Sequence, residues 1–491
     1  MSAAWEMIVG LEVHAQLKTR TKAFCRCSTS FGDPPNTNTC PVCLALPGAL
    51  PVLNERAVEL AARAALALGL EVRERSVFAR KNYFYPDLPK GYQISQFDRP
   101  LAERGSLAIG GGRSIGITRI HMEEDAGKSV HDRFAGFTAI DLNRAGVPLI
   151  EIVGEPEIRS SAEAAAYLRA LREVLLYTEV SDCSMEEGSL RVDANVSARP
   201  AGETAYRTRT EIKNLNSFSN VERALEIEFA RHCAVHEAGG TIVQQTMLYD
   251  AHKNEVRPAR SKEGSHDYRY FPEPDLPPLV LTDAWIQGVR CGLRELPAAR
   301  RARYASSYAL GAADADVLTA SRAVGDYFEK VASASGDAKA AANWVMGEVL
   351  ASLNESGGDI DEFPVTAASL GELVALVRSG SLSNTAAKAV FATMLQEMTV
   401  ASSGAATVMA ELKKVTPREI AERDGLVQVG DDSALAAWID EVWAEHPAEA
   451  ARFAGGERKL QGVLVGLVMK KSKGRADPKK VNQLLGARAG T

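Results

Sequence analysis

Polar residues, with an acid among them, occupy every second position in several short segments of the sequence. In the segment 9–17, Glu12 and His14 alternate with apolar residues; Asp193 does so in 190–198, and Glu211 alternates with threonines and Ile212 in 207–215. Successive residues of a strand face opposite sides of a sheet, so each segment predicts a strand with one polar, acid-bearing face. A fourth predicted strand, 115–122, leads into the acidic run at 123–125.

Rows of acids on neighbouring strands can form a metal site. Adjacent strands lie only ~5 Å apart, so carboxylates from several strands can converge on one hard cation. In proteins Mg²⁺ takes a few carboxylates together with substrate phosphates, as in phosphoryl transfer from a nucleotide. An ordinary solvated sheet face shows the same alternation, and the spacing alone leaves both interpretations open.

Four of the seven cysteines lie within nineteen residues, in two close pairs. Cys25 and Cys27 are followed, after twelve residues rich in turn-forming Pro and Asn, by Cys40 and Cys43. Two such pairs can supply four thiolates to a tetrahedral Zn²⁺, whose role would be structural because no coordination position stays open for a catalytic water. Four reduced, free cysteines are the alternative interpretation.

Length and composition indicate a protein of several globular domains. A chain of 491 residues is too long to fold around a single hydrophobic core. Its apolar and charged fractions, 46% and 24%, are close to the averages of globular proteins. We find no apolar run of membrane-spanning length and no targeting signal at the amino terminus, which predicts a cytoplasmic protein without a membrane partner. The net charge is −6, but residues 456–491 carry nine Lys or Arg against two acids and can neutralise phosphates.

The periodicity predicts an α+β fold. Up to about residue 290, strand patterns alternate with helices expected at 54–69, 161–178 and 219–238, and Ser160 and Ser161 are candidate caps of the second. The glycine run at 110–112 is expected to form a hairpin loop. A proline-rich stretch at 271–278 marks the end of the first domain, placed at 1–292. Helical domains are expected at 293–405 and 406–491.

The chain also resembles a known family, the GatB subunits of the glutamyl/aspartyl-tRNA amidotransferases. Eight segments of the first domain carry the resemblance: VGLEVH (9–14), RKNYFYPDLPKGYQISQ (80–96), HMEEDAGK (121–128), DLNRAGVPL (141–149), EEGSLR (186–191), EIKNLNS (211–217), RSKE (260–263) and DYRYFPEPDL (267–276). The segments AANWVMG (341–347) and GLVMK (466–470) extend it over the chain.

The resemblance implies a glutamine-synthetase-like cradle domain with a mainly antiparallel sheet, a helical domain and a tail domain that grips the tRNA body. In such enzymes ATP phosphorylates the side-chain carboxylate of Glu-tRNA(Gln) or Asp-tRNA(Asn), and ammonia then displaces the phosphate. A partner amidase, the glutaminase of the complex, supplies the ammonia by hydrolysing glutamine, and a small third subunit ties the two together.

Taken together with the family resemblance, the acidic rows are expected to form a catalytic Mg²⁺ site. The expected ligands, direct or through water, are Glu12, His14, Glu124, Asp193 and Glu211, with Glu123 as the alternative to Glu124. Lys213, Arg260 and Lys262 are expected to contact phosphates, and the alternative for each of them is an ion pair with a surface acid.

Two further groups of residues are candidate substrate contacts. The first is expected to border the ammonia path or the aminoacyl end of the tRNA, unless it is only turn chemistry around two prolines: Lys81, Tyr83, Tyr85, Asp87, Lys90 and Tyr92. The second is expected to contact tRNA phosphates, unless it is a solvated basic face: Lys470, Lys471, Lys473 and Arg475.

Two rival functions share parts of this pattern. A non-enzymatic tRNA-binding scaffold would have the basic tail and the zinc-stabilised segment, but its acidic rows would bind neither Mg²⁺ nor ATP. A glutamine-synthetase-like ligase acting on a free amino acid would need the carboxylates but would leave the basic tail without a task.

Overall fold

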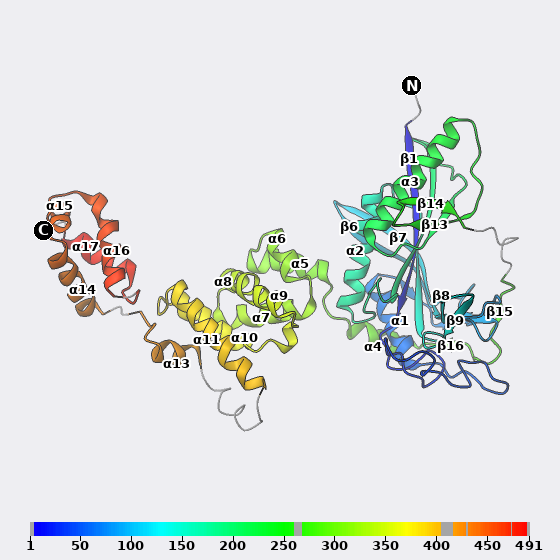
Figure 1. Cartoon of the computed structure of the whole chain (residues 1–491), viewed down its shortest axis with the longest axis horizontal. Coiled ribbons are helices and arrows are strands. Elements are labelled where there is room, and N and C mark those ends of the chain that lie inside the picture. The colour runs from blue at the N-terminus through cyan, green and yellow to red at the C-terminus, as the bar shows by residue number, and fades with distance from the viewer. Residues whose placement is uncertain (1–3, 260–267, 404–415, 429–430, 473, 489–491) are drawn as a thin grey trace. The chain divides into compact units, whose positions relative to one another are not determined.

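The structure, a computed structural model, describes residues 4–259, 268–403, 416–428, 431–472 and 474–488. The chain divides into two compact units, Met1–Pro297 and Ala298–Thr491, each described by itself (Figure 1). Three of the predicted contact residues, Arg260, Lys262 and Lys473, lie outside the described residues.

A nine-stranded sheet forms the centre of the first unit, in the order β14-β13-β12-β11-β1-β10-β7-β6-β2. Its middle strand is β1 (Trp5–Gln16), the long blue strand of Figure 1, which pairs antiparallel with β10 (Pro148–Gly154) and β11 (Leu190–Pro200). Only the pairing of β12 (Thr210–Lys213) with β13 (Thr246–Asp250) is parallel among these strands. The remaining strands are β7 (Arg113–Glu124), β6 (Ala102–Gly110), β2 (Glu71–Val72) and β14 (Glu255–Pro258).

Three helices cover one face of this sheet: α1 (Glu55–Ala67), α2 (Ser161–Tyr177) and α3 (Phe218–Glu237). The apolar residues at alternate positions of the strands, such as Leu11, Val192 and Ile152, belong to the same core as the helices. Because alternate strand residues face opposite ways, the acids and imidazoles between these apolar positions are left on the other face of the sheet.

The predicted α+β class is confirmed, and most of its expected elements form close to their predicted bounds. The predicted helices correspond to α1, α2 and α3, and Ser160 caps α2 by accepting a hydrogen bond from the backbone N of Glu163 at 3.1 Å. The glycine run joins β6 to β7 as a hairpin. The strand predicted at 207–215 is shorter, since β12 begins only at Thr210.

Shorter strands and one helix complete the first unit. The strand β4 (Ala79–Asn82) lies between β5 (Tyr92–Ser95) and β15 (Phe271–Pro272), β8 (Lys128–Phe134) pairs with β9 (Phe137–Asp141), and β3 (Arg75–Ser76) pairs with β16 (Leu279–Val280). The helix α4 (Asp283–Cys291) packs against α1. The strands β4 and β5 bear on the site because they form the two ends of the segment 80–96.

The described part of the second unit is helical and has two cores. The first core includes residues of α5 (Pro297–Tyr308), α6 (Ala312–Leu318), α7 (Arg322–Ser335), α8 (Ala338–Trp344), α9 (Leu350–Ser356), α10 (Ala367–Arg378), α11 (Asn384–Ser403) and α13 (Pro417–Arg423), with a π-helical turn, Val345–Val349, between α8 and α9. The second core is formed within α14 (Asp432–Glu445), α15 (Pro447–Ala454), α16 (Gln461–Lys471) and α17 (Pro478–Arg488). None of the helices in the described ranges is long and apolar enough to cross a membrane.

Candidate metal and substrate site

Four neighbouring strands bring acids and imidazoles together on the uncovered face of the sheet. In the register of β1, Glu12 stands opposite Asp193 of β11, and His14 stands opposite Glu151 of β10. Glu151 in turn stands opposite His121 of β7. The alternation of each strand therefore places these five side chains on the same face, as the period of two requires.

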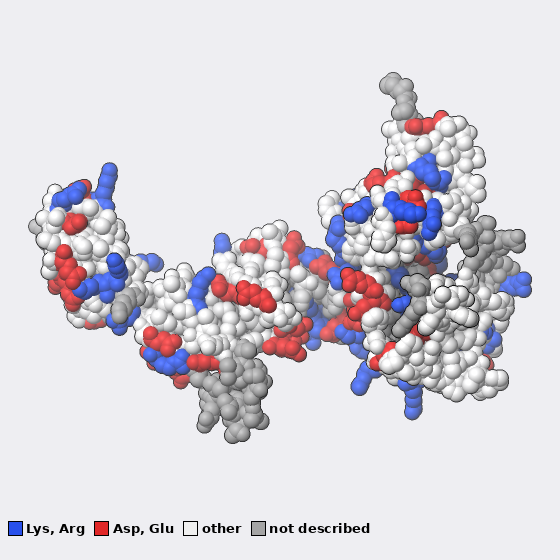
Figure 2. Space-filling model, viewed as in Figure 1, with Lys and Arg blue, Asp and Glu red and all other residues white. Residues whose placement is uncertain are grey.

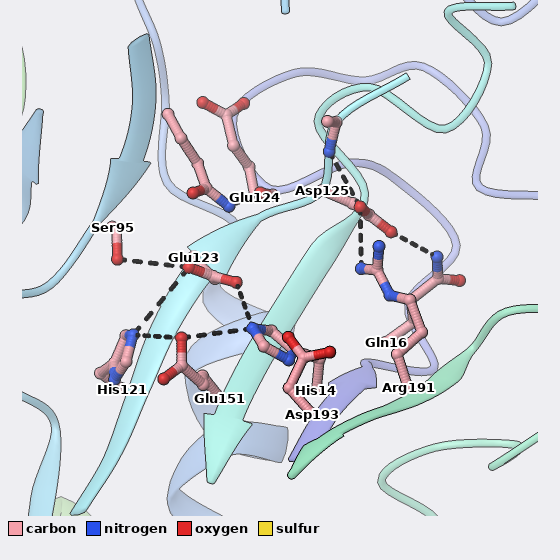
Figure 3. Close-up of polar contacts among 12 residues, drawn as sticks. His14, Gln16, Ser95, His121, Glu123, Glu124, Asp125, Glu151, Arg191 and Asp193 are labelled. Atoms are coloured by element: carbon pink, nitrogen blue, oxygen red, sulfur yellow. Dashed lines mark hydrogen bonds and ion pairs between the residues drawn. The ribbon is translucent and has the colours of Figure 1, made fainter. Parts of the chain in front are cut away.

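His14 lies at the centre of this group. Its Nε2 is 3.5 Å from Glu123 Oε1 and 3.2 Å from Glu151 Oε2, and Figure 3 shows both carboxylates directed at the ring. The three side chains offer one ligand atom each within 4.8 Å of one another, a spacing that suits a shared cation. Burial lowers the pKa of His14, but the hydrogen bond to Glu151 and the charges of Glu123 and Glu151 outweigh it and raise that pKa.

A second group of charges adjoins the first. Lys213 Nζ lies 2.8 Å from Asp193 Oδ2 and 3.0 Å from Glu211 Oε1, so these residues form one ion-paired cluster. The carboxylate of Glu12 accepts a hydrogen bond from Asn195 Nδ2 at 2.9 Å. Burial, and then the charges of the neighbouring carboxylates on β10, β11 and β12, raise the pKa of Glu12. The face therefore holds more negative charge than its cations offset.

The structure separates Glu124 from the other expected ligands. Its carboxylate is paired with the buried ammonium of Lys90 and accepts a hydrogen bond from the backbone N of Ile94 at 3.0 Å. Figure 3 shows Glu124 directed away from His14, because it follows Glu123 directly on β7 and successive strand residues face opposite sides. Of the two alternatives, Glu123 is the one that lies beside His14.

A cavity of about 940 Å³ includes in its lining Lys81, whose charge interacts with Glu123 and Glu151. Its lining includes Lys81, Tyr83, Tyr85 and Asp87 from the predicted substrate group, and also Asn82, Phe84, Ala126, Tyr268, Arg269 and Phe271. Burial lowers the pKa of Lys81, but Glu123 and other nearby groups, Glu151 among them, outweigh it and raise that pKa. Lys81 therefore links the lining of the cavity with the charges of the His14 group.

Two members of the predicted substrate group do not line this cavity. Lys90 is buried against Glu124, and its ammonium also lies 5.7 Å from the centre of the Phe24 ring. Tyr92 packs under the guanidinium of Arg80, which is 4.1 Å from the ring centre. The motif at 80–96 thus divides into a cavity-lining part and a part that packs into the protein.

Asp125 is a buried carboxylate at the end of β7. Its oxygens accept hydrogen bonds from Gln16 Nε2 at 2.8 Å and lie 2.9 Å from Arg191 Nη2, as Figure 3 shows. Arg144 approaches the same carboxylate at 3.7 Å and donates to the carbonyl oxygens of Ala126 and Gly127 at 2.9 and 2.8 Å. These bonds fix the chain segment that forms one wall of the cavity.

The four clustered cysteines converge. The sulfur atoms of Cys25, Cys27, Cys40 and Cys43 all lie within 4.8 Å of one another. The Cys43 thiolate accepts hydrogen bonds from the Cys25 thiol and the Cys40 backbone, and these bonds, despite burial, lower its pKa to about 4. Such an arrangement of sulfur atoms can hold a tetrahedral Zn²⁺.

The predicted tRNA contacts lie in and after α16. Lys470 is exposed, whereas Lys471 lies 3.1 Å from Glu441 Oε2 and also pairs with Glu445 of α14. The guanidinium of Arg475 lies 5.7 Å from the centre of the Trp438 ring. Figure 2 shows Lys and Arg interspersed with Asp and Glu on the drawn face of the α14–α17 helices.

Sequence reasoning missed two members of the central group, Glu151 and Ser95. Glu151 interrupts the apolar run PLIEIVG of β10, and a single carboxylate in such a run was the available signal. Ser95 donates a hydrogen bond to Glu123 at 3.4 Å, and no pattern in the sequence marks it. His121, whose Nε2 lies 3.3 Å from Glu151, belonged to a recognised motif without an assigned role.

Comparison with known proteins gives matches along the chain. The family described as the GatB/GatE catalytic domain matches residues 7–287, and the GatB domain family matches residues 326–488. The chain is 53% identical to the B-type subunit of the aspartyl/glutamyl-tRNA(Asn/Gln) amidotransferase of Prosthecochloris aestuarii over 485 residues, which is 98% of this chain and 97% of the relative. It is 51% identical to the protein of the same name from Geobacter sulfurreducens over 487 residues, 98% of each chain.

Proposed function

Because the chain belongs to the GatB family of amidotransferase subunits, we propose that it carries the transamidation site for Glu-tRNA(Gln), Asp-tRNA(Asn) or both. In this reaction ATP phosphorylates the side-chain carboxylate of the mischarged amino acid, and ammonia then replaces the phosphate. The observation that carries the proposal is the group formed by His14, Glu123 and Glu151 beside a cavity lined by Lys81.

The residues of this group fit a divalent cation. His14, Glu123 and Glu151 offer converging ligand atoms, and Glu12, Asp193 and Glu211 extend the carboxylates along the same face, where Lys213 is already paired with two of them. His121 adjoins the same group, since its Nε2 lies 3.3 Å from Glu151 Oε2. Mg²⁺ held by His14, Glu123 and Glu151 would offset negative charge on the reacting phosphate and carboxylate.

Phosphorylation solves a leaving-group problem. A free carboxylate resists ammonia because its departing oxygen is a poor leaving group, whereas an acyl phosphate combines an electrophilic carbon with a good leaving group. The acids would hold the cation, and Lys213 would contact the phosphates. Arg260 and Lys262, which lie outside the described residues, are proposed to contact the phosphates as well.

The cavity suits the aminoacyl end of the tRNA. Tyr83, Tyr85, Phe84 and Phe271 give it aromatic walls, and aromatic rings are the usual partners of unpaired nucleotide bases. Lys81 lines the cavity and interacts with the charges of Glu123 and Glu151, and it can hold the negative charge of the substrate side chain. The ion pair of Lys90 and Glu124, which does not line the cavity, is our proposal for a part of the route by which ammonia arrives from the amidase partner.

The remaining parts support the same function. Zn²⁺ at the four cysteines would stabilise the loop between them, and the exposed Lys470 and Arg475 would contact tRNA phosphates by charge and shape. A small third subunit would join this chain to the amidase.

The test measures ATP hydrolysis by the complex of this chain with its amidase partner, with Glu-tRNA(Gln) or Asp-tRNA(Asn) and ammonium chloride as the nitrogen source. We expect one mischarged tRNA to stimulate hydrolysis and to be converted to the amidated form. A rate of ATP hydrolysis that neither tRNA changes would instead support the scaffold or the free-amino-acid ligase.

A further inference from the structure

The loop between the two cysteine pairs docks on the chain segment 140–143 through Asn36. The backbone N of Asn36 donates to Asp141 Oδ1 at 3.1 Å, and its side-chain Nδ2 donates to the carbonyl oxygen of Ile140 at 3.0 Å. Its Oδ1 accepts a hydrogen bond from the backbone N of Leu142 at 2.8 Å. A single residue of the loop therefore fixes three consecutive residues of the segment.

Hydrogen bonds of two more side chains, Asn143 and Lys22, join the same two stretches of chain. Asn143 Oδ1 accepts from the backbone N of Asn38 at 2.8 Å, and Asn143 Nδ2 donates to the carbonyl oxygen of Pro34 at 2.8 Å. The fully buried Lys22 reaches both, because its Nζ donates to the carbonyl oxygens of Asn38 and Leu142 at 2.7 and 3.2 Å. The loop and the segment therefore hold together as one piece.

The segment 140–143 leads directly to a wall of the cavity. The next residue, Arg144, donates to the carbonyl oxygens of Ala126 and Gly127, and the backbone N of Gly127 donates to the carbonyl oxygen of Asp87 at 2.8 Å. Ala126 and Asp87 line the cavity. A continuous series of hydrogen bonds thus connects the cysteine loop with the proposed substrate site.

We infer that Asn36 is a positioning residue that transmits metal occupancy of the four-cysteine cluster to the cavity wall. The cysteines stand at both ends of the loop, so a bound metal closes the loop at its base. Without the metal the loop gains conformational freedom, and ordering Asn36 against the segment 140–142 costs more free energy. The inference rests on the proposed function of the cavity and on Zn²⁺ as the metal.

The variant Asn36→Gly isolates this contact. Asn36 has a φ of 62°, a left-handed conformation that glycine adopts without strain, and the residue is exposed, so its replacement removes side-chain hydrogen bonds without removing core packing. The matched control is Thr37→Val. It removes the hydrogen bond from Thr37 Oγ1 to the carbonyl oxygen of Pro34, which stays inside the loop.

The experiment compares the complex of full-length chain and amidase partner with zinc bound and after chelation, with zinc content measured in each sample. Two readouts are taken: ammonium-driven amidation, and hydrogen exchange at 125–128 and 140–147. In the unmodified chain and in Thr37→Val, we expect chelation to lower kcat by about tenfold and to speed exchange in both segments. Asn36→Gly should show both effects with zinc still bound, and chelation should then add little.

If chelation lowers kcat by the same factor in Asn36→Gly as in the unmodified chain, the two changes act independently. That result would overturn the inference. So would slow exchange at 125–128 in zinc-loaded Asn36→Gly. The exchange measurement needs no amidation, so a chain that never amidates tRNA would defeat the proposed function while the coupling is still judged from the exchange rates.

Discussion

Glu123 and Glu124 are adjacent in the sequence but lie in different surroundings. Glu123 joins His14 on the open face of the sheet, whereas Glu124 is buried with Lys90 on the other side of β7. A buried ion pair that loses one partner leaves an uncompensated charge in the protein, which costs about 3–5 kcal/mol. The two carboxylates should therefore respond differently to the same substitution.

We expect Glu123→Gln to raise the Mg²⁺ concentration needed for half-maximal ATP hydrolysis and to lower kcat by about 100-fold, because a cation ligand is lost. Glu124→Gln should instead lower the melting temperature and leave the Mg²⁺ requirement unchanged. Magnesium titrations and thermal unfolding of both variants check this. A normal Mg²⁺ requirement in Glu123→Gln would remove Glu123 from the metal site.

At the scale of elements, α3 is attached to the sheet by a buried polar cluster. Glu228 accepts hydrogen bonds from Thr210 of β12 at 2.7 Å and from Arg231 Nε at 2.9 Å, and His232 Nε2 lies 3.3 Å away. Burial raises the pKa of Glu228, but the hydrogen bonds from Arg231, His232 and Thr210 outweigh it and lower that pKa from 4.5 to about 2.

This lowered pKa makes the attachment of α3 dependent on pH. The charged Glu228 stabilises the folded first unit by about 3 kcal/mol above pH 4.5, and this contribution is lost as pH falls towards 2. Glu228→Gln should therefore lower the melting temperature at pH 7, and the difference from the unmodified chain should shrink between pH 4.5 and 2. Glu226→Gln, an exposed position on the same helix, serves as the control and should show no such trend.

The elements differ in how much of them the sequence could predict. Strands with one polar face, β1 and β11, alternate clearly, and their register brings Glu12 and Asp193 together as the acidic rows suggested. By contrast, β10 is apolar at nearly every position, so a period of two could not show which way Glu151 faces. Glu123 and Glu124 face opposite sides because β7 extends as far as Glu124. Single-sequence patterns do not fix the residue at which a strand ends.

At the scale of the molecule, the second unit has a separate core for its last four helices. A chain that ends before residue 410 lacks those helices and also α13 of the first helical core, but it keeps the nine-stranded sheet. We expect its first unit to remain folded and the chain to bind tRNA at least tenfold more weakly at low salt, because phosphate contacts supply much of such affinity. Filter binding over a salt series checks this; unchanged affinity would exclude the tail as a tRNA contact.

The ion pairs of the tail refine this expectation. Lys470 is exposed without an ion pair among the described residues, so Lys470→Gln should reduce the slope of log affinity against log salt by about 1. Lys471 is already paired with Glu441 and Glu445, and Lys471→Gln should change the slope less. Equal slopes for the two variants would contradict the view that intramolecular pairing withdraws Lys471 from the tRNA.

The central place of β1 has a consequence for biosynthesis. Both neighbours of β1 come from residues 148–200, so β1 waits for its partners until the chain has been made to about residue 200, roughly 10–40 s. During this time the apolar face of β1 is not covered by the core, and we expect the nascent chain to depend on a chaperone. Ribosome-bound chains ending near residue 140 should be digested readily by protease, and chains extending well beyond residue 300 should resist it.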